Sequence, residues 1–385
     1  MKFTQRTGAH DSPARTGTVV VRGRTFETPV FMPVGSAASV KALTFPQLTE
    51  MGAQICLANA YHLYLRPGVD IIRDLNGLHR LTGWPGAFVV DSGGYQVFSM
   101  QAVRKISADG VCFRSYIDGS PHYFDAEKVI DVQLALDPDI AMILDDCTPY
   151  PADRIRAQKG VDLTVNWAKR ATVYHRSLAL LPEKTPSLFG IVQGSVFPDL
   201  RRICAERLLE LDFAGYAIGG LSVGEPKEDM WEVLSTVVPL LPDDRPKYLM
   251  GVGTPEDVVA AVELGLDMFD CVLPTRNGRN GTAFTSRGVV TAKAARYKTS
   301  PEPLDENCDC FVCRTYSRAY LRHLLNINHI TASVLLSYHN VWFYLELMQS
   351  LRRAIDEGKF TDYKNEFLAG YRSGDQTTSP EKEED

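Results

Sequence analysis

Several carboxylates stand where short apolar stretches of the chain end, and their types and spacing suggest chemistry at a sugar carbon. Asp91 follows FVV, Asp145 and Asp146 follow IAMIL, and Asp270 follows MF. Two carboxylates facing one substrate can cleave a bond at an anomeric carbon, because one attacks the carbon while the other transfers the leaving group's proton. Glycosidases and base-exchange enzymes share this chemistry, so the carboxylates alone leave both classes open. Other apolar stretches end in Asn59, Gln193, Gly219, Gly220 and Met250.

A second cluster has the spacing of a metal site. Cys308, Cys310 and Cys313 form a C-x-C-x-x-C group, and His339 follows inside a helical run. Three thiolates and one imidazole make a closed tetrahedral set that is typical of structural zinc. A catalytic zinc is less suited to this set, because four good ligands leave no open position. Free thiols or redox cysteines are the alternative interpretation.

The elements that must position these residues alternate between strand and helix. Eight short β-rich runs occur: VFMPVG, ICLANA, FVVDSGG, IAMILDD, SLFGIVQG, YAIGGL, YLMGVG and MFDCVLP. Helical patterns lie between them, at about 45–51, 126–136, 161–180, 199–211, 228–241 and 255–264. Eight such units predict a closed (β/α)8 barrel, ahead of an open doubly wound sheet. Catalytic side chains are then expected at the carboxyl ends of the strands.

The strand-helix pattern ends at about residue 285, which suggests three regions. We expect a barrel over residues 1–285 and a zinc-binding subdomain with C-terminal helices packed on the barrel over 286–371. In the subdomain, the sequence predicts a short β-like piece, GVVTAK, and helices at about 317–326 and 330–357. Residues 372–385 are polar and acidic without an apolar face, which predicts a disordered tail.

Composition restricts the class of protein further. The 385 residues carry a formal net charge of -6, but residues 276–322 hold nine Lys or Arg against four acids. This segment could therefore contact nucleic acid although the whole chain is acidic. No apolar run reaches the roughly 18 residues of a membrane span, and the first residues lack the apolar part of a secretory signal, so we expect a cytoplasmic protein.

With these motifs the sequence resembles the tRNA-guanine transglycosylases, and in particular the bacterial members. The similarity runs from about Arg15 to Tyr371 and includes TPVFMPVG, YHLYLRPG, DSGGYQVFS, DDCTPYPA, VQGSV, YAIGGLSVGE, YLMGVG, MFDCVLPTRNGRNGTAFT and the metal ligands. The resemblance implies a zinc-dependent fold and a pentosyltransferase of queuosine biosynthesis. Such an enzyme exchanges guanine at the wobble position of tRNAs with a G-U-N anticodon for 7-aminomethyl-7-deazaguanine.

The resemblance also assigns roles to the carboxylates. It implies that Asp270 is the nucleophile, which forms a covalent bond to the ribose, and that Asp91 is the general acid and base. Asn59 is similar to the residue that holds this carboxylate in the empty site. Asp145 matches the reader of the Watson-Crick edge of guanine, because a carboxylate can accept from two adjacent N–H donors.

Further contacts follow from the same resemblance. Gln193 and the backbone N–H of Gly220 would donate to O6 of the base, and Gly219 and Leu221 belong to the same pocket. Tyr95 and Met250 resemble the two faces between which the base is held. The remaining positions are Cys147 and Val223, which resemble the bacterial pocket, and Arg276 and Arg279, which match contacts to the neighbouring anticodon nucleotides.

The sequence departs from the family pattern at Ala58, Ala60 and Asn277, and two rival functions are also considered. LANAYHL replaces the usual LGNTYHL, so Ala58 and Ala60 stand where Gly and Thr are common. A barrel glycosidase that uses Asp91 and Asp270 is one rival, although it would need no guanine-reading Asp145. A non-catalytic RNA-binding partner chain is the other, although such a chain is expected to lose the nucleophile. Bacterial members form homodimers, and the resemblance implies the same here.

Overall fold

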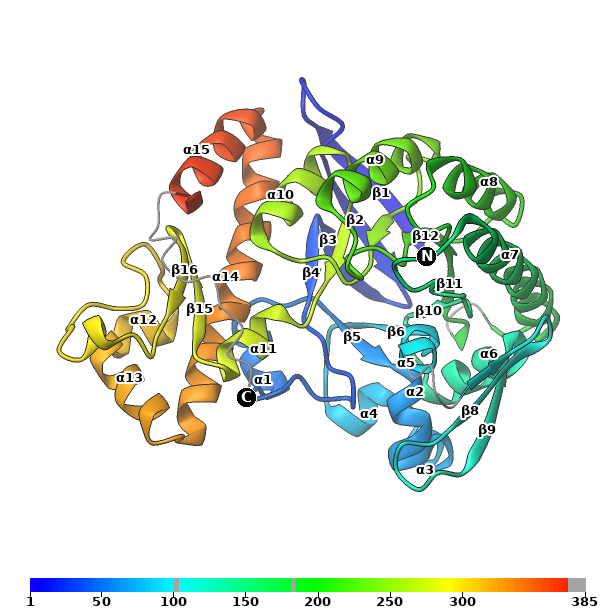
Figure 1. Ribbon diagram of the computed structural model, residues 1–385, viewed down its shortest axis with the longest axis horizontal. Helices are drawn as coiled ribbons and strands as arrows, with labels where there is room; N and C mark the ends of the chain where they lie inside the picture. The colour runs from blue at the N-terminus through cyan, green and yellow to red at the C-terminus, as the bar shows by residue number, and fades with distance from the viewer. Residues whose placement is uncertain (100–103, 182–183, 373–385) are drawn as a thin grey trace.

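Eight parallel strands form the centre of the computed structural model, which describes residues 1–99, 104–181 and 184–372. The strands are β4 (Val30–Met32), β5 (Ile55–Asn59), β6 (Ala87–Asp91), β10 (Ile140–Met142), β11 (Ser187–Val192), β12 (Gly215–Ile218), β13 (Lys247–Leu249) and β14 (Met268–Asp270). Their order is β4-β14-β13-β12-β11-β10-β6-β5, and a parallel bridge from Val34 to Leu57 joins the two ends (Figure 1). All eight predicted strands are present, and the predicted (β/α)8 barrel is confirmed.

Helices follow the strands and surround them (Figure 1). They are α1 (Phe45–Glu50), α2 (Ala60–Leu63), α3 (Val69–Asp74), α4 (Leu78–Thr82), α5 (Gly94–Ser99), α6 (Ala126–Leu136), α7 (Arg154–Ser177), α8 (Pro198–Leu209), α9 (Lys227–Val237), α10 (Pro255–Glu263) and α11 (Leu273–Arg279). Several begin at side-chain caps: Asp125, Asp153 and Thr254 each accept a hydrogen bond from a backbone N–H of the first turn. These caps fix where each loop ends, and thereby where the strand-end residues point.

Two antiparallel sheets were not predicted from the sequence. The first contains β1 (Lys2–Gly8), β2 (Arg15–Val21) and β3 (Arg24–Thr28), and the second contains β7 (Arg104–Ile106), β8 (Gly110–Arg114) and β9 (Pro121–Asp125). Arg15 pairs with the buried Asp267, which immediately precedes β14, and Arg24 pairs with Asp139, which immediately precedes β10. The first sheet therefore covers the amino ends of the barrel strands, and the loops at the carboxyl ends remain available for a site.

The C-terminal part contains a hairpin and four helices. They are β15 (Thr282–Thr285), β16 (Gly288–Thr291), α12 (Phe311–Thr315), α13 (Arg318–Asn326), α14 (Ile330–Asp356) and α15 (Phe360–Arg372). The helix α15 was not predicted, and Arg372 is its last residue rather than the first residue of the expected tail. The rest of that tail, residues 373–385, lies outside the described residues.

The long helix α14 joins the C-terminal part to the barrel. It packs against α11 and β4, and the rings of Phe31 and Tyr344 lie 4.7 Å apart between their centroids. The Tyr344 hydroxyl donates to the carbonyl of Gly253 in the barrel. One hydrophobic core contains residues of both parts, so α14 covers the barrel as a barrel helix would. The boundary at residue 285 stays a prediction about domain organisation.

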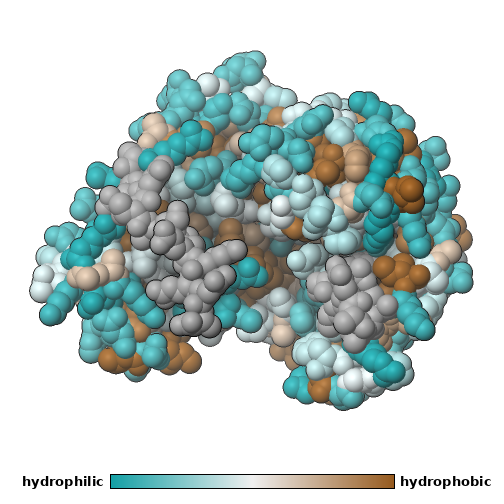
Figure 2. Space-filling view, viewed as in Figure 1, coloured by the Kyte–Doolittle hydropathy of each residue, from teal (hydrophilic) through white to brown (hydrophobic). Residues whose placement is uncertain are grey.

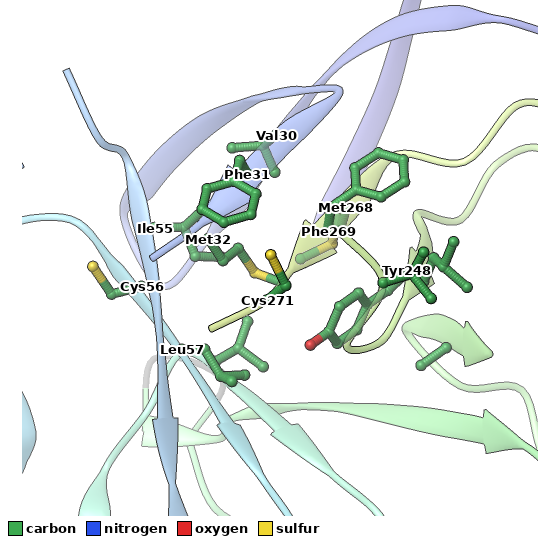
Figure 3. Packing of buried hydrophobic residues seen from close by; sticks show 14 of the residues in the cluster. Val30, Phe31, Met32, Ile55, Cys56, Leu57, Tyr248, Met268, Phe269 and Cys271 are labelled. Atoms are coloured by element: carbon green, nitrogen blue, oxygen red, sulfur yellow. The ribbon is translucent and has the colours of Figure 1, made fainter. Parts of the chain in front are cut away.

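Figure 3 shows the part of this core where the first and last strands meet. Phe31 and Met32 of β4 lie between Ile55 of β5 and Phe269 of β14, and all four side chains are fully buried. Close packing at this seam holds the ends of the barrel together.

Among the described helices, none is long and apolar enough to cross a membrane.

Candidate active site and metal centre

A cavity of about 360 Å³ opens at the carboxyl ends of the barrel strands. Its lining includes twelve residues that the sequence predicted: Asn59, Asp91, Tyr95, Asp145, Cys147, Gln193, Gly219, Gly220, Leu221, Met250, Asp270 and Arg276. Val223 lines it as well. Arg279 does not line the cavity; it is exposed on α11, and its Nε donates to the carbonyl of Thr275. The barrel therefore gathers into one place residues that are more than 200 positions apart.

Asp91 is held by the strand beside it. The Asn59 and Asp91 Cα atoms are partners in the β5–β6 ladder, and the Asn59 Nδ2 donates to Asp91 Oδ2 at 2.6 Å. Backbone N–H groups of Ala60 and Gly93 donate to the other carboxylate oxygen, both at 3.1 Å. Ala60 is fully buried and contributes only its backbone to this network. The carboxyl group is thus fixed by three donors.

Asp270 is held by a tyrosine that sequence reasoning missed. The Tyr248 hydroxyl donates to Asp270 Oδ1 at 2.6 Å, and the backbone N–H of Gly251 donates to the same oxygen at 2.9 Å. Figure 3 shows the Tyr248 ring within the core, with its hydroxyl directed toward the side of Leu57 and Cys271. No bond to Asp270 Oδ2 is formed by the described residues, which leaves that oxygen available to a substrate.

Asp145 and Gln193 are hydrogen-bonded to each other in the cavity. Gln193 Nε2 donates to Asp145 Oδ2 at 2.7 Å, and the Ser92 hydroxyl donates to Asp145 Oδ1 at 3.1 Å. Gln193 Oε1 is buried without a hydrogen-bond partner among the described residues. A buried acceptor without a partner is costly, so this end of the amide does not add to the stability of the fold. Asp146, next in the chain, points elsewhere and forms a buried ion pair with Arg156.

Three of the carboxylates that line the cavity share an unusual electrostatic environment. Burial raises the pKa of Asp91 to about 7, against the opposing hydrogen bonds from Ala60 and Gly93, and the charge of Asp270 raises it further. Burial also raises the pKa of Asp145 to about 6 and raises the pKa of Asp270. A carboxyl group with a pKa near neutrality can both give and take a proton, which suits Asp91 to general acid-base catalysis.

The predicted metal ligands come together beside the barrel. Nδ1 of His339 lies 3.8 Å from Cys308 Sγ, 3.5 Å from Cys310 Sγ and 3.3 Å from Cys313 Sγ. All four ligand atoms lie within 4.8 Å of one another. His339 is fully buried on α14, and its Nε2 contacts the carbonyl of Phe284 in β15 at 2.7 Å, which leaves Nδ1 free to bind a metal. The group is therefore a structural metal centre that ties a loop to α14.

Comparisons with known proteins show the family of this chain. A family model described as queuine tRNA-ribosyltransferase matches residues 11–373. The queuine tRNA-ribosyltransferase of Caldanaerobacter subterraneus subsp. tengcongensis is 53% identical over 358 residues, which cover 93% of this chain and 94% of that protein. The chain belongs to the queuine tRNA-ribosyltransferase family.

Further relatives support the same membership. A queuine tRNA-ribosyltransferase of Thermoanaerobacter pseudethanolicus is 50% identical over 93% of this chain and 94% of that protein. Another from Pelotomaculum thermopropionicum is 48% identical over 97% of this chain and 99% of that protein. Because these alignments cover almost the whole of both chains, the barrel and the metal-binding region belong to one family architecture. The resemblance inferred from the motifs is confirmed.

Among the residues that sequence reasoning missed, three are hydrogen-bonded to residues that line the cavity. Tyr248 and Arg201 are fully buried, and Ser92 is 2% exposed. Tyr248 lies in an apolar strand, so the sequence pattern predicts a core residue. A buried tyrosine hydroxyl needs a hydrogen-bond partner, however, and this requirement could have indicated that Tyr248 bonds a polar residue. Arg201 lies in an amphipathic helix, where an arginine ordinarily predicts a solvated face.

The pH dependence of stability tests the environment of Asp91. Its pKa is about 7 in the folded protein and about 3.9 in an unfolded chain. The unfolded chain therefore ionises first, and the wild type loses stability as the pH rises from about 4 to about 7. We expect that Asp91→Asn, which lacks this group, gains in unfolding temperature relative to the wild type from pH 5 to pH 8 and gains no more from pH 8 to pH 9. Thermal unfolding followed by circular dichroism measures this difference.

The matched control is Asp244→Asn, which changes an exposed aspartate near the amino end of β13. Its difference from the wild type should not rise in the same pH interval. A difference between Asp91→Asn and the wild type that stays constant from pH 5 to pH 8 would contradict the assigned environment.

Proposed function

We propose that the protein is a tRNA-guanine transglycosylase that exchanges the wobble guanine of G-U-N anticodons for 7-aminomethyl-7-deazaguanine. The observation that carries this proposal is one cavity in which Asp91, Asp145 and Asp270 are all buried and separately held. Two carboxylates would serve a glycosidase equally well. The third, Asp145, with the Gln193 amide beside it, matches a purine edge that offers N1–H and N2–H donors next to an O6 acceptor.

The reaction proceeds in two displacements at C1′ of the ribose. Asp270 Oδ2 attacks C1′, the bond from C1′ to N9 breaks, and its electron pair leaves with guanine, which takes a proton from Asp91. The incoming base then gives a proton to Asp91 and attacks C1′, and the Asp270 carboxylate leaves. The proton returns to its starting place, so the exchange needs no other reactant. The pKa of Asp91, about 7, suits both directions of transfer.

The base is read at its edge and held at its faces. Asp145 accepts from N1–H and N2–H, and Gln193 releases Asp145 and donates to O6 together with the N–H of Gly220. Tyr95 is 56% exposed at the mouth of the cavity and Met250 lines it, which places one aromatic and one polarisable side chain at the faces of the base. Cys147 and Val223 border the same cavity, where a valine leaves room for a small 7-aminomethyl group.

Exposed arginines beside the nucleophile fit the anticodon loop. Arg276 and Arg279 stand on α11, directly after Asp270, and both are exposed. Guanidinium groups can contact phosphates and stack on unpaired bases, so they suit nucleotides next to the extruded guanine. This interaction with tRNA accords with a cytoplasmic location.

The metal in the Cys3His centre is a zinc ion. Zn–S bonds of about 2.3 Å and Zn–N bonds of about 2.0 Å at tetrahedral angles place neighbouring ligand atoms about 3.5 Å apart. The Sγ to Nδ1 distances of 3.3 Å to 3.8 Å fit this geometry. Four protein ligands complete the coordination, so the ion supports the fold and α14, and takes no part in the exchange.

A homodimer is the assembly we propose. The C-terminal part exposes large apolar side chains at the ends of α12, α13 and α14: Phe311, Tyr320, Ile327 and Ile330. Figure 2 shows hydrophobic surface where α13 meets α14, on a face that is otherwise mostly hydrophilic. An apolar surface of this kind is typical of a subunit interface.

Base exchange tests the proposed function. Pure protein is incubated with radiolabelled guanine and an unmodified tRNA transcript with a G-U-N anticodon. We expect label in the tRNA with the wild type and with Asp244→Asn, and a loss of about 10⁴-fold or more with Asp270→Asn, because the nucleophile is removed. Competition by 7-aminomethyl-7-deazaguanine, but not by the larger queuine, is expected. Hydrolysis of a sugar substrate without any exchange would establish a glycosidase instead.

Tyr248→Phe tests how the nucleophile is held. The Tyr248 hydroxyl lowers the pKa of Asp270 against the effect of burial, so its removal raises that pKa. We expect kcat/KM to fall about 10-fold, as for a lost hydrogen bond to a charged group, and the acid limb of the pH profile to move to higher pH. Tyr216→Phe is the control, because among the described residues that hydroxyl accepts from the Phe213 backbone N–H and lies outside the cavity lining. An unchanged acid limb in Tyr248→Phe would contradict the role.

Metal analysis tests the zinc centre. We expect one zinc per chain by mass spectrometry of the wild type, and less than about a tenth of this in His339→Ala with a lowered unfolding temperature, since structural zinc contributes folding energy directly. His323→Ala, an exposed histidine of α13, should keep its zinc. Wild-type protein that contains no zinc, or that keeps its stability after chelation, would refute the assignment.

A further inference from the structure

One guanidinium is completely buried directly behind the base-reading part of the cavity. Arg201 of α8 is 0% exposed, and all of its hydrogen bonds go to backbone carbonyls. Nε donates to Ser195 at 2.8 Å, and Nη1 donates to Val192 at 2.8 Å and to Gly219 at 2.7 Å. Nη2 donates to Gly220 at 3.1 Å. The side chain therefore connects the end of β11 with the end of β12.

This arginine forms no ion pair with any residue in the described ranges. Burial lowers its pKa to about 10, so the group still carries its charge at neutral pH. Burying a charge costs several kcal/mol, and the charge of Glu225 and the four carbonyls offset part of that cost here. An apolar side chain of similar volume would remove the donor from these carbonyls, which accounts for an arginine at this place.

The four carbonyls belong to the segments that carry the reading groups. Val192 immediately precedes Gln193, and the two glycines provide the backbone that faces it. A Cβ on Gly219 would lie 2.8 Å from Gln193 Nε2, and a Cβ on Gly220 would lie 2.4 Å from Gln193 Oε1. Gly220 also has a φ of +64°. The glycine backbone and the Gln193 amide are thus in direct contact, and a shift of one displaces the other.

A carboxylate holds the next part of the same loop by its backbone N–H groups, whereas the guanidinium holds backbone carbonyls. Glu225 accepts hydrogen bonds from the backbone N–H groups of Ser222 and Val223. The guanidinium binds carbonyls of the loop and the carboxylate binds its N–H groups. The backbone N–H of Gly220 lies between these two attachments. Among the described residues, it donates to no backbone carbonyl.

We propose that Arg201 is a positioning residue for recognition of the 6-oxo group of the base. This inference rests on the proposed function, in which Gln193 and the Gly220 N–H donate to O6. Arg201 does not touch the base. It holds the carbonyls of both strand ends so that the two donors converge at one point, and a site built to bind an oxygen then discriminates against bases that lack a good acceptor there.

Guanine and 6-thioguanine provide the test. Both bases offer N1–H and N2–H to Asp145, but sulfur is a much weaker acceptor than oxygen at position 6. Inhibition constants of both are measured against label exchange for the wild type, Arg201→Met and Arg201→Lys, with thermal unfolding of each protein. Arg202→Met is the matched control, because Arg202 is the next residue of α8 and is exposed.

We expect Arg201→Met to raise the inhibition constant of guanine about 10-fold or more, as for one lost hydrogen bond to a fixed oxygen. The inhibition constant of 6-thioguanine should rise much less. Arg201→Lys keeps the charge but not the fork of donors, so it should lie between Arg201→Met and the wild type. Arg202→Met should match the wild type for both bases. The ratio of the two constants, rather than activity alone, separates positioning of the O6 donors from general loss of structure.

Three results would overturn the proposal. An equal rise in both inhibition constants would assign Arg201 a general structural role. Unchanged inhibition constants in a folded variant would show that Arg201 has no role in base recognition. If Arg201→Met is insoluble, Arg201→Lys decides by the same ratio, and insolubility of both variants would assign a folding role instead. A wild type that binds neither base would instead refute the proposed function, which is a different outcome from an unaltered ratio in the variants.

Discussion

The hydrogen bonds between parallel strands hold the two proposed reacting groups, Asp91 and Asp270, in place. Asn59 stands beside Asp91 because β5 and β6 pair in that register, and Asp270 stands beside Met32 because β14 pairs with β4. A slip of one residue in either pair would turn these side chains to the opposite face of the sheet. Closure through the bridge from Val34 to Leu57 then sets the distance between the two sides of the cavity.

The carboxylates in this cavity lower the stability of the fold at the pH at which they act. Burial raises the pKa of Asp91, Asp145 and Asp270, so each is more costly to ionise than in water. Each carboxylate nevertheless keeps a small set of donors: an amide and two N–H groups, an amide and a hydroxyl, or a hydroxyl and one N–H. These donors offset part of the cost and prevent the three side chains from exchanging partners, which keeps the proposed roles separate.

Support for the cavity comes from two directions. The first antiparallel sheet covers the amino ends of the strands, where Arg15 and Asp267 form a buried pair. The helix α14 covers β4 from the side, and its Asn340 donates to the carbonyl of Pro274 and accepts from the backbone N–H of Phe284. Because Pro274 directly follows the Asp270 loop, the C-terminal part stabilises the segment that carries the proposed nucleophile and the exposed arginines.

The sequence by itself determined the barrel, the metal ligands and the carboxylates that line the cavity at Asp91, Asp145 and Asp270. Eight apolar runs with polar ends alternate with helical patterns, which favours a parallel barrel over an open doubly wound sheet, and three cysteines with one histidine match a tetrahedral metal geometry. These signals are local, because hydrophobic periodicity and ligand type are written in consecutive residues. The motifs around Asp91, Asp145 and Asp270 were sufficient to identify the family.

Only the tertiary structure decided which groups other than Asn59 hold those residues. Tyr248 and Arg201 carry no local signal, since a tyrosine in an apolar strand predicts a core residue and an arginine in an amphipathic helix predicts a solvated face. Their partners lie 22 residues away for Tyr248 and up to 19 for Arg201, on other elements of the barrel. The pKa of Asp91 likewise depends on burial by the whole fold. Contacts between distant elements and the exclusion of water arise when the whole chain packs in three dimensions. They therefore leave no local pattern in consecutive residues.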